Sequence, residues 1–63
     1  MNRDESEQLW TEQEVADFLQ VKVRTVRHWR QTSTGPPFLR VGRFVRYDPA
    51  EVRRWAREQH PPR

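Results

Sequence analysis

KVRTVRHWRQ, residues 22–31, is the stretch around which the rest of the chain is organised. At 100° per residue, Val23, Val26 and Trp29 fall on one side of a helix, and the other side is cationic. The apolar side can pack against a partner helix. The cationic side suits a polyanion, although an ordinary solvated face is the alternative. Helices shorter than ~12–15 residues are marginal in water without tertiary packing, so the flanking segments must supply the fold.

The composition restricts the class of protein. A chain of 63 residues forms one small domain, of a size that buries only ~60% of its unfolded surface. Three Trp, three Phe and one Tyr can build a small core from large rings. No Cys is present, which excludes disulfides and Cys-zinc sites, and two His 32 positions apart are a weak basis for a metal site. Apolar residues never run more than two in a row, so we expect no signal peptide, no membrane span and a cytoplasmic protein.

The net charge of +3 is unevenly distributed. Residues 1–19 contain six acidic residues and one Arg, whereas residues 20–63 contain eleven basic residues and three acidic ones. The two parts therefore carry −5 and +8. This asymmetry is typical of a chain in which one surface meets phosphate and another does not.

The segment before the central stretch predicts a first helix, from Glu12 to Leu19 or Gln20. Thr11 and Glu14 have the spacing of a capping box. Trp10 and Val15 have the spacing of a hydrophobic staple across the same helix start. A gap of about three residues then leads to the central helix, and two short helices so spaced match a helix-turn-helix unit. The core-facing residues of the first helix would be Val15, Phe18 and Leu19.

The segment after the central helix predicts a break, a hairpin and a third helix. TSTGPP, residues 32–37, ends the helix. Residues 38–41 and 44–47 are rich in β-branched and aromatic side chains, and Gly42-Arg43 between them suits a type II′ turn. Asp48 is an N-cap followed by Pro49, which predicts a helix ending near Glu58. We therefore expect a mainly α fold with a small β-hairpin, a winged helix-turn-helix over residues 9–58, with a disordered tail at 1–8 and a tail at 59–63.

Three runs of residues resemble a known family. LWTEQEVADFLQV (9–21), RTVRHW (24–29) and PPFLRVGRFVRYDPAEVRRW (36–55) are similar to the excisionase and MerR-like family of small phage and bacterial DNA-binding proteins. That family commonly has Gly in place of Gln20 and a capping Ser in place of Lys22. Losing the Ser cap removes ~1 kcal/mol of helix stabilisation. We interpret Lys22 as a phosphate contact, the alternative being a tolerated poor cap. Arg30 is expected to lay its stem along Trp29 or Trp55 with its guanidinium in water.

The resemblance and the charge pattern together give a set of candidate DNA contacts. An Arg fork can meet the O6 and N7 atoms of guanine in the major groove, so the base-edge candidates are Arg24, Arg27 and His28, with Thr25 and Gln31 behind them. Arg40, Arg43 and Arg46 would follow the DNA backbone or enter the minor groove, the alternative for each being an idle surface charge. The other arginines form a group that we expect to be a solvated face: Arg53, Arg54 and Arg57.

The resemblance implies an excisionase, also called a recombination directionality factor. Such a protein binds adjacent attachment-region sites cooperatively, bends the DNA and directs a phage integrase toward excision. We expect double-stranded DNA as the partner, self-association on DNA, and neither a cofactor, a metal nor a small-molecule ligand. His28 has no nucleophile, carboxylate pair or second His at useful spacing, so we expect no enzyme activity. The chain is little more than the binding fold, which favours an architectural role. The alternatives are a small MerR-like transcriptional regulator and a protein-interaction module with a basic face.

Overall fold

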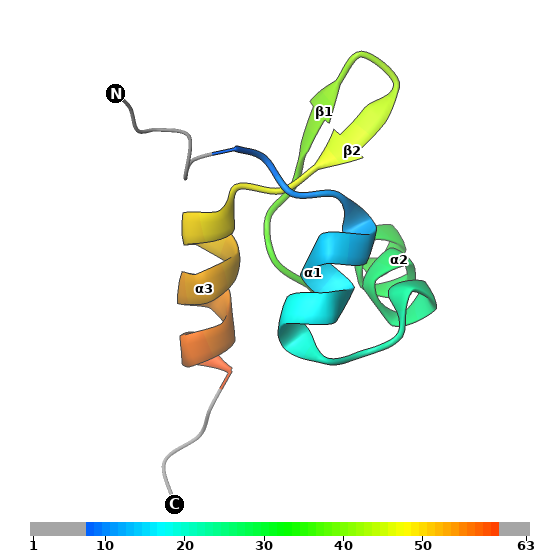
Figure 1. Ribbon diagram of the computed structural model, residues 1–63. Helices are drawn as coiled ribbons and strands as arrows, with labels where there is room; N and C mark the ends of the chain where they lie inside the picture. The colour runs from blue at the N-terminus through cyan, green and yellow to red at the C-terminus, as the bar shows by residue number, and fades with distance from the viewer. Residues whose placement is uncertain (1–7, 60–63) are drawn as a thin grey trace, which may run out of the picture.

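The computed structural model, which describes residues 8–59, contains three helices and one antiparallel hairpin (Figure 1). The elements are α1 (Glu12–Leu19), α2 (Val23–Thr32), β1 (Leu39–Val41), β2 (Phe44–Arg46) and α3 (Pro49–Glu58). In Figure 1, α1 lies between α2 and α3, and the hairpin projects away from the helices. The predicted winged helix-turn-helix is confirmed. The predicted tails fall, at residues 1–7 and 60–63, outside the described residues.

Helix α1 begins at the predicted capping box. The Glu14 amide donates to Thr11 Oγ1 at 3.1 Å, and the Thr11 amide donates to Glu14 Oε1 at 2.8 Å. The helix ends at Gln20, whose backbone has φ 60° and ψ 44° in the left-handed region. Glycine adopts this conformation without steric cost, whereas a residue with a Cβ is strained there. This backbone conformation explains why the family that the sequence resembles commonly has Gly in place of Gln20.

Gln20→Gly is expected to raise the free energy of unfolding by about 1 kcal/mol, because it relieves the strain of the left-handed conformation. Thermal or urea unfolding followed by circular dichroism would measure the change. Gln13→Gly is the matched control: Gln13 is exposed inside α1, where glycine should cost about 1 kcal/mol. A fall in stability for both variants would contradict the explanation.

Helix α2 has an uncapped start and a sharp end. Lys22 occupies the N-cap without a side-chain hydrogen bond, and the first turn contains no acidic residue. At the other end Ser33 is left-handed, with φ 59°, and the Thr34 amide donates to the Trp29 carbonyl at 3.0 Å. A Cβ on Gly35 would lie 2.7 Å from the Cβ of Trp29, so only glycine allows this close return of the chain.

The hairpin has the predicted turn but shorter strands. Val41 pairs with Phe44, which leaves Gly42 and Arg43 as the two loop residues. Gly42 has φ 64°, and Arg43 is not among the residues with positive φ, as expected for a type II′ turn. Tyr47 lies beyond the hairpin ladder and forms a bridge with Trp10 instead, through backbone hydrogen bonds of 2.7 and 2.8 Å. The chain before α1 is thus attached to the end of the hairpin.

The buried core is mainly aliphatic. Its members are Val15, Ala16, Val26, Tyr47 and Val52, each no more than 1% exposed. The expectation of a core built from large rings holds for Tyr47, which is buried, but not for the tryptophans. Trp10, Trp29 and Trp55 are only partly buried, and Trp29 and Trp55 contact each other with ring centroids 5.2 Å apart.

The prediction that Phe18 faces the core is also wrong, since Phe18 is 44% exposed. Val15, Ala16 and Leu19 form the inward line of α1, and Phe18 falls to the side of that line. There its ring lies 5.2 Å from the ring of Trp10. Within the described part of the chain, no helix has the length and apolar character needed to cross a membrane.

Candidate nucleic-acid interface

Helix α2 divides into the two predicted sides. Val26 is fully buried against the core, and Val23 and Trp29 are half-buried beside it. The turn before α2 is closed by the end of α1, because the Val21 amide donates to the Ala16 carbonyl at 3.0 Å. The predicted contacts on the far side are exposed, apart from the half-buried Thr25: Lys22, Arg24, Arg27, His28 and Gln31. The sequence therefore presents a nearly continuous basic surface on one helix.

The three arginines of the hairpin lie in different surroundings. Arg43 is exposed at the tip, in the turn. Arg40 stacks over the Phe38 ring at 5.9 Å from its centroid. Arg46 is half-buried, stacks over Phe44 at 5.2 Å and donates from Nη1 to the Val45 carbonyl at 2.8 Å. Arg43 is thus the most open of the three, and the guanidinium of Arg46 is already held by its own strand.

A groove of about 410 Å³ runs between α2, the start of α1 and the hairpin. Arg27 and Arg30 of α2 line one side of it, and Arg43 and Arg46 of the hairpin line another. Three predicted contacts, Arg27, Arg43 and Arg46, are therefore brought to one place by the fold. The groove is not lined by the remaining predicted contacts, which are Lys22, Arg24, Thr25, His28, Gln31 and Arg40.

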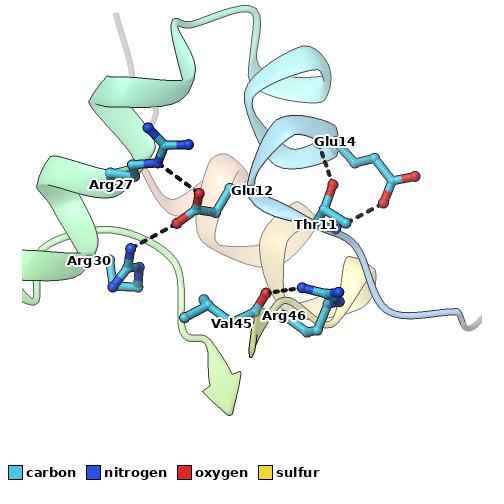
Figure 2. A network of polar contacts seen from close by, with 7 residues as sticks. All are labelled: Thr11, Glu12, Glu14, Arg27, Arg30, Val45 and Arg46. Carbon is cyan, nitrogen blue, oxygen red and sulfur yellow. Dashed lines mark hydrogen bonds and ion pairs between the residues drawn. The ribbon is translucent and has the colours of Figure 1, made fainter. Parts of the chain in front are cut away.

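One carboxylate enters this basic region. Glu12 of α1 accepts from Arg27 Nε at 2.9 Å through Oε1 and from Arg30 Nη2 at 2.8 Å through Oε2 (Figure 2). The sequence alone does not indicate this bridge, because Glu12 lies 15 positions before Arg27 and belongs to another helix. Within residues 8–59, Arg24 makes no ion pair, so the two leading base-edge candidates differ in their surroundings.

The expectation that the Arg30 guanidinium lies in water is wrong. The Arg30 side chain is only 20% exposed and faces Glu12, whose side chain is 19% exposed. Arg30 also lies close enough to the buried Tyr47 to affect it: burial raises the pKa of the Tyr47 hydroxyl, and the charge of Arg30 opposes this rise. Arg30 is held inward because α1 supplies a carboxylate at the point where α2 crosses it.

The pKa of Glu12 lies below its ordinary range. Burial alone would raise this pKa, but the hydrogen bonds from Arg27 and Arg30 and the charges of both arginines together outweigh burial. A carboxyl group with a lowered pKa in the folded state stabilises the fold fully above its unfolded pKa, and that contribution is lost as pH falls through the folded-state pKa.

Acid is therefore expected to weaken the fold partly through Glu12. The free energy of unfolding should decrease below about pH 5, and Glu12→Gln should make this decrease smaller. Urea unfolding at a series of pH values would measure both slopes. Glu58→Gln, at an exposed position near the end of α3, is the control. Parallel pH slopes for the wild type and Glu12→Gln would contradict the assignment.

The arginines of α3 engage other partners. Arg53 lies over the Trp10 ring at 5.5 Å from its centroid, and Arg54 pairs with Glu51 at 3.2 Å one turn earlier. Arg57 is exposed, as are the other two. Exposed pairs of this kind contribute little to stability, and the group keeps its interpretation as a solvated face. No group of three or more potential metal ligands occurs within the described part of the chain.

Comparison with known proteins adds one match to this geometry. The model of the family described as "Helix-turn-helix domain" matches residues 11–60, most of the chain. No curated protein and no solved structure matches the chain. The matched residues include α1, α2, the hairpin and α3, so the family match and the observed fold agree. The chain belongs to the helix-turn-helix domain family.

Proposed function

We propose that this protein binds double-stranded DNA sequence-specifically and acts, without enzyme activity of its own, as a phage or prophage excisionase. Its family implies double-stranded DNA binding. The observation that carries the proposal is the convergence of Arg27 from α2 with Arg43 and Arg46 from the hairpin on one groove. A duplex lying across this surface would meet cationic side chains from two elements at once.

In this arrangement α2 lies in the major groove. Ten residues make a helix of ~15 Å, and the major groove, ~12 Å wide, admits an α-helix. Arg24, Arg27 and His28 would then face base edges, and Lys22, at the uncapped start of α2, would lie near a phosphate. The hairpin would follow the backbone or the neighbouring minor groove with Arg43 at its tip.

The hairpin also has a feature that supports contact between copies bound side by side on DNA. Leu39, Val41 and Phe44 are 43%, 49% and 56% exposed. Leu39 and Val41 are two residues apart and Phe44 pairs with Val41, so all three share one face of the hairpin. Phe44 also lines the groove that would receive DNA, so Leu39 and Val41 are the part of this face left for contact between neighbouring copies. Exposed apolar side chains so close to the DNA-binding residues favour cooperative assembly, which an excisionase needs.

Binding to DNA is tested by a salt titration with a duplex selected by the protein from a random library. Neutralisation of several phosphates should give a steep linear fall of log affinity with log salt concentration. Leu39→Thr combined with Val41→Thr should leave binding to one site intact and reduce cooperativity on a duplex with two adjacent sites. The absence of duplex affinity would reject the proposal and favour a basic protein-interaction module.

The excisionase role is tested by recombination. Purified protein added to an integrase and its attachment-site DNA should increase excision, and Arg43→Ala should reduce the increase. If duplex binding persists but excision does not respond, the second proposed role, a small MerR-like transcriptional regulator, is favoured. A reporter gene placed downstream of the selected site would then show the regulation directly.

A further inference from the structure

We propose that Glu12 is a positioning residue for sequence recognition, because it fixes the edge of the Arg27 guanidinium that is offered to DNA. This inference rests on the proposed DNA binding. Glu12 belongs to α1, outside the surface of α2 that would read the bases, so it acts through Arg27. It is also the only carboxylate that pairs with α2 among residues 8–59.

The bond to Glu12 uses one particular donor of Arg27. Nε donates to Glu12 Oε1 at 2.9 Å, while the Arg27 side chain stays 55% exposed. A guanidinium can meet a pair of acceptors either through Nε and one Nη or through its two Nη atoms. With Nε occupied, the two Nη atoms form the free fork. Figure 2 shows both of them at the end of the Arg27 side chain, on the side turned away from the bond to Glu12.

Arg30 makes this support rigid. It occupies the second oxygen of the same carboxylate at 2.8 Å, and the side chains of Glu12 and Arg30 are both about one-fifth exposed. The Nε of Arg30 is buried and makes no hydrogen bond within the described residues, and Glu12 is the only carboxylate that pairs with Arg30 among residues 8–59. The Glu12 carboxylate is held on one side by the half-buried Arg30. It therefore cannot rotate freely when the Arg27 side chain moves. Arg27 is therefore the exposed member of a fixed cluster of three.

This differs from an ordinary surface ion pair. Such a pair joins two mobile, exposed side chains and imposes little order on either. Here Glu12 places a negative charge in the basic surface that is proposed to meet phosphate, and this charge lowers the attraction for any DNA. The same carboxylate orders one arginine for end-on recognition of an acceptor pair such as guanine O6 and N7. Glu12 thus lowers the affinity for all DNA and raises the discrimination between sequences.

The test is the specificity ratio, the affinity for the selected duplex divided by that for a random-sequence duplex of equal length. Glu12→Gln can support only one arginine, and Glu12→Asp keeps the charge but shortens the reach. Both should lower the ratio by about tenfold, part of the discrimination that one bidentate contact supplies. Glu12→Gln should also leave unchanged or raise the affinity for random DNA, because it removes a negative charge. Asp17→Asn is the matched control, an exposed acid on α1.

A double-mutant cycle separates positioning from mere stability. In an Arg27→Ala background, Glu12→Asp should lower the specificity ratio no further. Melting curves should show that each variant is folded at the assay temperature. An unchanged ratio in both Glu12 variants, or an equal loss with Arg27 absent, overturns the role of Glu12. A wild type that binds the selected and random duplexes equally, or binds neither, overturns the proposed sequence-specific function itself.

Discussion

Arg27→Ala is expected to lower affinity for the selected duplex by about tenfold to a hundredfold and to lower affinity for random DNA much less. The fork of Arg27 is exposed and oriented, and one bidentate base contact supplies ~1–3 kcal/mol of discrimination. Fluorescence anisotropy with both duplexes at one fixed salt concentration would measure the two losses. We expect this change to leave the fold intact, because Arg30 keeps its bond to Glu12.

Arg43→Ala is the matched control for Arg27→Ala. Arg43 lies at the exposed tip of the hairpin, where contact with phosphate gives affinity without sequence information. Its removal should weaken binding to both duplexes alike and make the salt dependence shallower by about one phosphate contact. If the two variants lose the same amount of specificity, the division of labour between α2 and the hairpin is wrong.

Tyr47→Ala is expected to leave the chain largely unfolded at room temperature. Tyr47 is 1% exposed and is the largest fully buried side chain, and removal of a buried aromatic ring costs ~3–5 kcal/mol. Domains below ~70–80 residues rarely gain more than ~3–5 kcal/mol from one core, so the loss is comparable to the whole stability. Loss of the helical circular dichroism signal and of a cooperative melting transition would show it.

Two variants test whether position, and not aromatic character alone, explains this effect. Tyr47→Phe keeps the ring in the core and should keep a cooperative transition. Phe18→Ala removes a ring that is 44% exposed and should cost much less than Tyr47→Ala. Similar losses for Phe18→Ala and Tyr47→Ala would show that the core is centred elsewhere.

The elements that could be predicted from the sequence are those set by local chemistry. Three local signals each predict where a helix or strand begins or ends. They are the capping box at Thr11, the Asp48 cap followed by Pro49, and the glycine at the hairpin turn. The 3.6-residue period of α2 likewise predicts its exposed and buried sides. These features need no knowledge of which segments meet in space.

The features that escaped prediction depend on contacts between distant segments. Glu12 and Arg30 are 18 positions apart, and only the crossing of α1 and α2 brings them together. Ala16 faces inward beside Val15, whereas Phe18 is exposed, and which of the two positions faces the core is set by where α2 packs on α1. Alternation predicts that Leu39 and Val41 share a face, but not that this face stays about half exposed.

The bridge between Trp10 and Tyr47 links the hairpin to α1 mechanically. Both backbone groups of Trp10 are bonded to Tyr47, and Glu12 follows only two residues later. A tilt of the hairpin would therefore move the first turn of α1 with it. That turn carries Glu12, so one short length of backbone joins the hairpin to the carboxylate that pairs with Arg27 and Arg30.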